Sequence, residues 1–160
     1  MPVPAPDPVS IRPATDNDAA PILALVPRLA ATGTPALRDP AQVEAADLAS
    51  VAQALQDGSD ACAFFVADID GAVAGFIHVR RVRDYYTQSD IAHVSDVVVA
   101  PFAEGRGVGR LLMARAEQSA RDQGFGLLQL YVLPENAPAR TLYEKLGFAP
   151  EWLKYVKPLD

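Results

Sequence analysis

The sequence is poor in the residues that bind metals or form disulfides. Its 160 residues include one cysteine, Cys62, and two histidines, His78 and His93. A single cysteine excludes an internal disulfide and fits a reducing cytoplasm, and two histidines form no cluster with metal-ligand spacing. We therefore expect a cytoplasmic protein without a metal site, in which the Cys62 thiol is buried and unreactive.

Long apolar runs and positive charge are also scarce. No run of 18 apolar residues exists, so we expect no membrane span. The proline-rich residues 1–8 lack the basic and apolar regions of a secretory signal, and we expect a flexible tail there. The net charge of −6 argues against nucleic acid and is compatible with a cationic amine substrate. Residues 9–160 are long enough for one domain with a real core.

Hydrophobic periodicity and chain breakers predict alternating elements. Pro21 and Pro27 should shorten or kink the first helix, which Thr15 or Asp16 can cap. The Asp70-Gly71 pair is a strong hairpin signal. The expected strands are 9–12, 61–67, 72–80, 91–99, 127–132 and 152–156, and the expected helices follow residue 15, run over 40–56 and 107–123, and follow Asn136.

The most informative stretch is a valine-rich strand ended by Pro101 and followed by Gly105, Gly107 and Gly109. Such a turn aims the free N–H groups of a helix start at one point, which suits a phosphate or pyrophosphate. A dinucleotide-binding turn needs Gly-x-Gly-x-x-Gly, and a P-loop needs Gly-Lys-Ser/Thr; the chain has neither. Arg106 and Arg110 could add positive charge to such a site.

The run Glu104-Gly105-Arg106-Gly107-Val108-Gly109 resembles the acyl-CoA-binding motif of GNAT-type N-acetyltransferases, Gln/Arg-x-x-Gly-x-Gly/Ala. The second and third defined positions match, at Gly107 and Gly109. Glu104 departs from the usual first residue, and this departure brings a carboxylate close to the expected pyrophosphate.

A second stretch, 130–148, resembles the other signature of that family, in which a strand is followed by Asn, Ala, a Leu-Tyr pair and Gly-Phe. The matching residues are Asn136, Ala139, Leu142, Tyr143, Gly147 and Phe148. The two motifs occur in the family order, about 30 residues apart. The resemblance covers roughly residues 60–150 well and the N-terminal third only by layout.

This resemblance implies an α/β protein with a mixed, largely antiparallel sheet and helices on both faces. The strands near 91–99 and 127–132 would splay apart, and acyl-CoA would enter the gap. The implied reaction transfers an acetyl group from acetyl-CoA to a primary amine by direct attack in a ternary complex. The alternative is a catalytically weak acyl-CoA-binding sensor or interaction module of the same fold; the presence of Tyr143 favours the enzyme.

The resemblance also implies site residues. Tyr143 would protonate the leaving thiolate, and Asn136, on the same side of a helix, could bind the pantetheine amide. Backbone N–H groups of Val97 and Val99 would contact the carbonyl and the pantetheine. The implied acyl-CoA-binding residues are Val97, Val98, Val99, Glu104, Gly105, Arg106, Gly107, Val108, Gly109, Arg110, Asn136, Ala139 and Tyr143.

The general base is predicted on the same valine-rich strand. His93, with an ordinary pKa of about 6.5, can accept a proton near neutral pH. Asp96 is the competitor. Strand alternation puts His93 and Ser95 on one face and Asp96 on the other, unless a bulge intervenes. His93 and Ser95 fall where members of the family place catalytic carboxylates.

The acceptor is expected to be a small amine or a peptide amine, bound by residues 32–45, 83–92 and the region of Trp152. Acidic and aromatic side chains there would suit an amine with an apolar body, although they could equally be ordinary surface residues. These side chains are Asp39, Glu44, Asp84, Tyr85, Tyr86, Asp90 and Trp152. A homodimer is left open.

Overall fold

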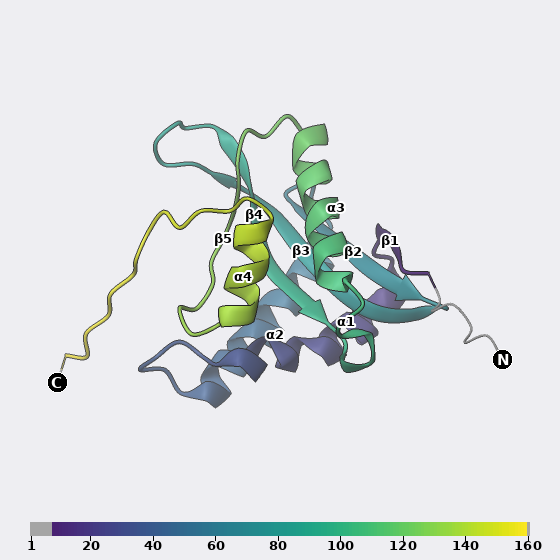
Figure 1. The fold of residues 1–160 in the computed structure, drawn as a ribbon, viewed down its shortest axis with the longest axis horizontal. Helices are drawn as coiled ribbons and strands as arrows, with labels where there is room; N and C mark the ends of the chain where they lie inside the picture. The colour runs from purple at the N-terminus through teal and green to yellow at the C-terminus, as the bar shows by residue number, and fades with distance from the viewer. Residues whose placement is uncertain (1–7, 160) are drawn as a thin grey trace.

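Five strands form one sheet in the order in which they occur in the chain (Figure 1). The computed structural model describes residues 8–159, so most of the predicted tail lies outside the described residues. Neighbouring strands are antiparallel except β4 and β5, which are parallel, and this confirms the expected mixed sheet. The strands are β1 (Ser10–Pro13), β2 (Cys62–Ile69), β3 (Ala72–Arg83), β4 (Asp90–Val99) and β5 (Leu128–Leu130).

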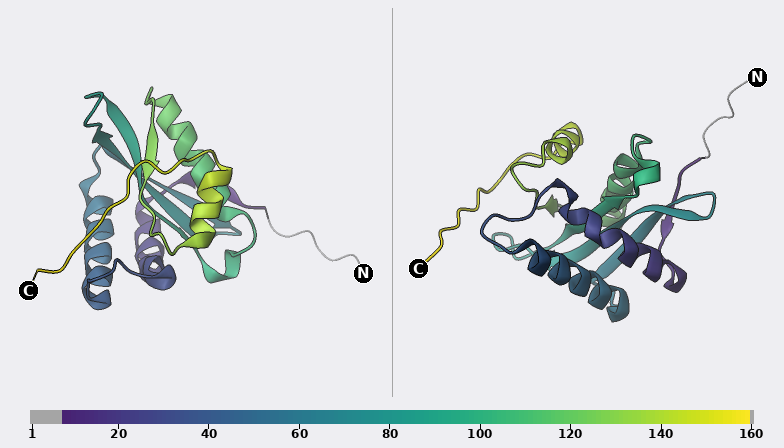
Figure 2. Two further views of the ribbon diagram at one scale, coloured as in Figure 1. Left: turned by 60° about the vertical axis from the view of Figure 1, so that its left-hand side comes forward. Right: turned by 90° about the horizontal axis from the view of Figure 1, so that it is seen from below.

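Helices cover both faces of this sheet, as expected (Figure 2). The helical segments are η1 (Asp16–Asp18), α1 (Ala19–Leu25), η2 (Val26–Thr32), α2 (Pro40–Asp57), η3 (Pro101–Ala103), α3 (Val108–Asp122) and α4 (Ala137–Lys145). Helix α1 gives way to the 3₁₀ segment η2 next to Pro27, whose ring cannot continue an α-helix. The Asp39 carboxylate caps α2 by accepting the N–H of Ala41 at 2.8 Å, and Gly58 ends the helix with a φ of +55°.

The sheet separates two apolar cores. On one face α3 packs on β1 to β4, and its buried Leu112 and Met113 meet Ile77 and Val94 of the sheet. On the other face Ile22 of α1 and Val51 of α2 pack with the sheet residues Val66, Phe76 and Val98. Alternate strand residues therefore serve different cores, which is the pattern of a sheet buried on both faces.

The strand β4 changes its environment halfway along. Residues 92–94 pair with β5 residues 128–130 on one edge and with β3 on the other, but beyond Val94 only β3 continues as a partner. The expected splay of these two strands is thus confirmed. In the same place the register slips, because Val79 faces Val94 while His78 faces Asp96, so that Ser95 is the extra residue of a bulge.

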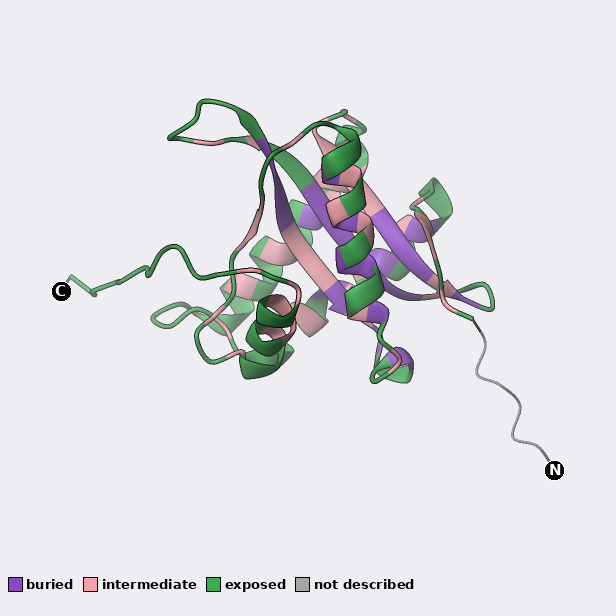
Figure 3. Ribbon diagram, turned by 45° about the horizontal axis from the view of Figure 1, so that its top comes forward, coloured by how far each residue is buried: buried purple, intermediate pink, exposed green. Residues whose placement is uncertain are grey.

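The predicted strand at residues 152–156 is wrong. Residues 149–159 have no regular structure, and they are exposed (Figure 3). Its apolar residues have the composition of a strand, but no neighbouring strand takes up their backbone hydrogen bonds. Trp152 instead stacks on Tyr86 of the β3–β4 loop, with ring centroids 6.2 Å apart. None of the helices in residues 8–159 is both long and apolar enough to cross a membrane.

Candidate active site

The glycine-rich turn leads from β4 into the N-terminus of α3. Gly105 and Gly107 have φ values of +74° and +75°, which glycine adopts without strain. A Cβ added at Gly107 would have no heavy atom within 4 Å, so the space beside the helix start is open. Among the predicted residues of this turn, Arg106 is half-buried, Arg110 is exposed and Val108 belongs to the core.

Gly109 marks the place where three elements meet. A Cβ there would lie 3.7 Å from both Leu142 of α4 and Val99 of β4. The start of α3, the helix that carries Tyr143 and the end of β4 are therefore adjacent. We call the part of β4 beyond Val94, which pairs only with β3, its free half. These are the three elements on which the sequence placed the acyl-CoA site.

The free half of β4 presents backbone groups to the splay. The N–H of Ala100 donates to the carbonyl of Ala74 on β3 at 2.8 Å. Because backbone groups alternate in direction along a strand, those of Val97 and Val99 point away from β3, toward the side on which β5 has diverged. The Val98 side chain is buried in the opposite core.

Tyr143 lies on α4 and packs against the α3-side core, and its ring makes an edge-type contact with Phe148, with centroids 5.9 Å apart. Burial raises the pKa of its hydroxyl, which therefore stays protonated at neutral pH. Asn136 caps α4, as predicted, by accepting the N–H of Ala139 at 3.3 Å. Its amide nitrogen donates to the hydroxyl of Thr32 at 3.0 Å, so one N–H of the two remains for a ligand.

The bulge at Ser95 corrects the predicted arrangement of the base candidates. With one extra residue in the strand, Asp96 does not lie opposite His93 but joins it on the face covered by α1 and α2. The evidence is that Asp96 Oδ2 lies 2.9 Å from Nδ1 of His78, which stacks on Phe64 with ring centroids 4.2 Å apart. Both base candidates thus share one face.

His93 is buried, and its ring lies between two side chains. Its Nδ1 is 3.2 Å from the amide nitrogen of Gln129, and the Tyr131 ring centroid is 5.0 Å from its own. Burial, helped by the positive charge of Arg80, lowers the pKa of His93. The imidazole is therefore neutral at neutral pH, which is the state a general base requires.

Two residues of this region had no signal in the sequence. His78 contacts Asp96 only because of the bulge, and no sequence motif predicts that bulge. Arg28 of η2 donates its Nε–H to the carbonyl of Val99 at 2.8 Å and forms an ion pair with Glu104. Glu104 is 76 residues away from Arg28 in the chain, so only the fold brings the two charges together.

The predicted acceptor residues divide into two groups. Three of the carboxylates have partners within the protein: Asp39 caps α2, Asp84 binds Thr87 at 2.7 Å, and Asp90 pairs with Arg83 at 3.4 Å. Glu44 is exposed on α2. The three aromatic side chains, Tyr85, Tyr86 and Trp152, form one exposed cluster.

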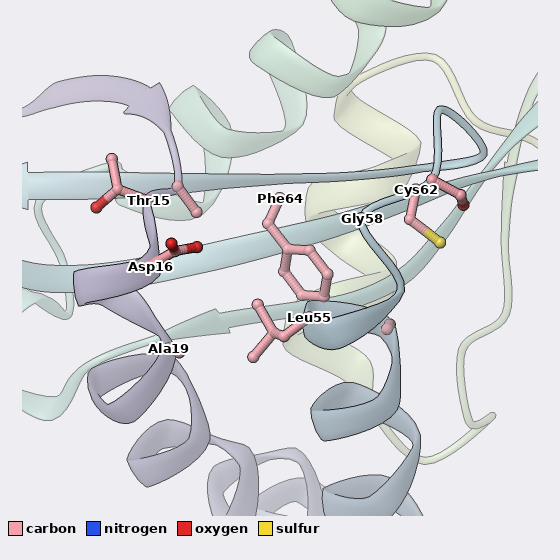
Figure 4. Close-up of a pocket in the computed structure, with 10 residues that line it drawn as sticks. Thr15, Asp16, Ala19, Leu55, Gly58, Cys62 and Phe64 are labelled. Atoms are coloured by element: carbon pink, nitrogen blue, oxygen red, sulfur yellow. The ribbon is translucent and has the colours of Figure 1, made fainter.

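A pocket of about 210 Å³ lies elsewhere, between η1, the end of α2 and β2. Figure 4 shows Thr15 and Asp16 on one side of the Phe64 ring and Cys62 on the other. None of the predicted site residues lines it. Cys62 is half-buried rather than buried, and this partial burial raises the pKa of its thiol, as expected of an unreactive cysteine.

Solved structures share this fold. A putative acetyl transferase from Pyrococcus furiosus superposes with a TM-score of 0.78 at 22% identity, covering 95% of this chain and 100% of that one. The aminoglycoside N-acetyltransferase AAC(6′)-Iy in complex with CoA gives a TM-score of 0.74 at 24% identity, covering 98% of each chain. At these identities the likeness concerns the fold.

Curated relatives match part of the sequence. Streptothricin acetyltransferase from Streptomyces lavendulae is 38% identical over 93 residues, which are 58% of this chain and 47% of the relative. A mycothiol acetyltransferase from Thermomonospora curvata is 39% identical over 89 residues, 56% of this chain and 28% of the relative. The chain thus matches less than half the length of either. The model of the Acetyltransferase (GNAT) family matches residues 32–148, and the chain belongs to that family.

Proposed function

We propose that the protein is an N-acetyltransferase that transfers the acetyl group of acetyl-CoA to a primary amine by direct attack in a ternary complex. The observation that carries this proposal is the splay of β4 and β5, with the glycine-rich start of α3 at its mouth and Tyr143 beside it. Family membership supports the reaction class.

The donor site fits the chemistry of acyl-CoA. The first-turn N–H groups of α3, together with Arg106 and Arg110, suit a pyrophosphate because the helix dipole and both side chains are positive. The outward backbone groups of Val97 and Val99 can exchange hydrogen bonds with the amides of a pantetheine arm, as a neighbouring strand would. Asn136 has one N–H left for the same arm.

The chain's own residues then supply the proton transfers. Bound acetyl-CoA contributes a thioester that an amine can attack. The Tyr143 hydroxyl is protonated at neutral pH and is our candidate for the proton donor to the leaving thiolate. The backbone of β4 offers N–H groups to the thioester oxygen.

His93 is the base we favour, with Asp96 as the competitor. His93 is neutral, and contact with Gln129 orients its ring through Nδ1. Nε2 can accept the proton of the amine in the tautomer that carries its hydrogen on Nδ1, which the oxygen of the Gln129 amide can accept after a flip of that amide. Asp96 lies on the same face but already engages His78. A base on this face would receive an acceptor that approaches from the side of α1 and α2.

The acceptor class we propose is a small-molecule amine or a peptide amine rather than nucleic acid or a membrane. One relative is named as a streptothricin acetyltransferase, and another as a mycothiol acetyltransferase. The exposed aromatic cluster of Tyr85, Tyr86 and Trp152 offers cation–π contacts to an ammonium group. Homodimerisation and a cytoplasmic location remain part of this proposal.

The test is acetyl-CoA turnover with a panel of aminoglycosides, streptothricin, amino acids and peptides, followed by thiol release and mass of the product. We expect amine-dependent release well above the blank without amine, and one added acetyl group on the product. Tight binding of CoA without acetylation of any amine would support the sensor alternative. Absence of CoA binding by calorimetry would overturn both functions.

A further inference from the structure

The segment η2 makes hydrogen bonds with two elements of the proposed donor site, β4 and α4. Arg28 binds the carbonyl of Val99 on β4, and Thr32, at the end of η2, accepts a hydrogen bond from Asn136 at the start of α4. Because both contacts come from one short segment, η2 links β4 to the start of α4, the helix that carries Tyr143.

Glu104 presents an electrostatic problem at this place. It occupies the first position of the glycine-rich motif, and its side chain is 63% exposed beside the turn that should bind a pyrophosphate. A carboxylate there repels an anionic ligand. The ion pair with Arg28 cancels that charge.

Arg28 retains the capacity to bind a further anion. A guanidinium carries five N–H donors, and Arg28 uses one on Val99 and one on Glu104. These contacts hold the planar group at the junction of β4 and the glycine-rich turn. The remaining donors suit phosphate oxygens, which guanidinium groups bind in pairs.

We propose that Arg28 directs its remaining N–H donors to the pyrophosphate of the donor and that Glu104 is its positioning partner. The N–H donors that the usual Arg or Gln would bring to the motif come instead from a distant segment, held there by a carboxylate. This inference rests on the proposed function, since it assumes that acyl-CoA binds in the splay.

The test measures CoA affinity by calorimetry for the wild type, Arg28→Gln, Glu104→Gln and the double variant. We expect Arg28→Gln to weaken binding by roughly tenfold or more, because a charged contact is lost and Glu104 is left unpaired. Glu104→Gln alone should change the affinity by less than about threefold, because the amide oxygen still accepts a hydrogen bond from Arg28 and keeps it in place. The double variant should bind CoA more tightly than Arg28→Gln.

Two smaller ligands test which part of CoA is in contact with Arg28. The penalty of Arg28→Gln should be the same for 3′-dephospho-CoA, which keeps the pyrophosphate, and should be absent for pantetheine, followed by NMR titration. Arg28→Lys should recover part of the affinity. Arg121→Gln and Glu117→Gln are matched controls, since this exposed pair lies toward the other end of α3.

Three results would overturn the inference. Unchanged CoA affinity in folded Arg28→Gln removes the role of Arg28, and an equal loss for pantetheine makes that role structural. A penalty that disappears with 3′-dephospho-CoA moves the contact to the 3′-phosphate. A wild type that binds neither CoA nor pantetheine would instead refute the proposed function itself.

Discussion

The two faces of the sheet are built from different kinds of residue. Every buried residue of the core beneath α3 is apolar. The opposite face carries His78, His93 and Asp96 on adjacent strands, beneath α1 and α2. The proposed donor site on the first face would therefore depend on backbone groups and shape, whereas the second face holds His78, His93 and Asp96, which can titrate. Variants of the two faces should have different kinetic signatures.

The largest effect is expected at Tyr143, our candidate for the proton donor. Tyr143→Phe keeps the ring and its packing but removes the proton donor, so kcat should fall by roughly 10- to 1000-fold. CoA affinity, measured by calorimetry on the same protein, should stay near that of the wild type. Full turnover in Tyr143→Phe would exclude this role.

Donor binding itself should be sensitive at Gly107. In Gly107→Asp a side chain with negative charge enters the open space beside the helix start, at a φ that L-residues rarely adopt. CoA affinity should fall at least about tenfold. Gly126→Asp adds the same charge at an unhindered glycine outside the turn and should bind CoA normally. Equal affinities in the two folded variants would place the pyrophosphate elsewhere.

The opposite face should respond through pH. Burial lowers the pKa of His93 below its ordinary value of about 6.5, so a His93 base stays neutral and active at pH 6.5 and is lost by protonation only as the pH falls through that lowered pKa. His93→Gln should flatten this acidic limb of kcat/KM and lower the rate near neutrality, with CoA affinity unchanged. An unaltered profile in His93→Gln, together with collapse of the rate in folded Asp96→Asn, would assign the base to Asp96.

The smallest effect on activity is expected at a buried carboxylate of η1 that is not among the predicted site residues. Asp18 accepts two hydrogen bonds from Arg12, at 2.7 and 3.0 Å, and this guanidinium lowers the pKa of Asp18 to about 2. Asp18 therefore stabilises the fold above about pH 4, and this contribution is lost as the pH falls through 2. Asp18→Asn should cost about 1–3 kcal/mol of unfolding free energy, measured in urea, with kcat nearly unchanged. A large loss of kcat in the folded variant would contradict this separation.

What the sequence could predict depended on local signals. The helix predicted over 40–56 agrees with α2 to within one residue, and the predicted hairpin at Asp70-Gly71 follows from two residues with positive φ. The two motifs were sufficient to predict the family and, through it, the divergence of β4 and β5. The pairing of Arg28 with Glu104 depends on the fold rather than on local sequence, so no pattern could predict it.

The remaining errors have the same origin. A bulge adds one residue to β4 and so moves Asp96 to the face of His93; alternation alone cannot locate such an insertion. The residues around Trp152 have strand composition, but a strand also needs a neighbour, and composition says nothing about neighbours.

The unpaired half of β4 also gives the protein a built-in reporter of occupancy. The amide hydrogens of Val98 and Ala100 point toward β3, whereas those of Val97 and Val99 point into the splay. Without a ligand, amide exchange with deuterated solvent should therefore alternate along the strand, slow at Val98 and Ala100 and fast at Val97 and Val99. A ligand that accepts hydrogen bonds from Val97 and Val99 should slow their exchange and remove this alternation. Residue-resolved exchange would therefore detect donor binding without any turnover.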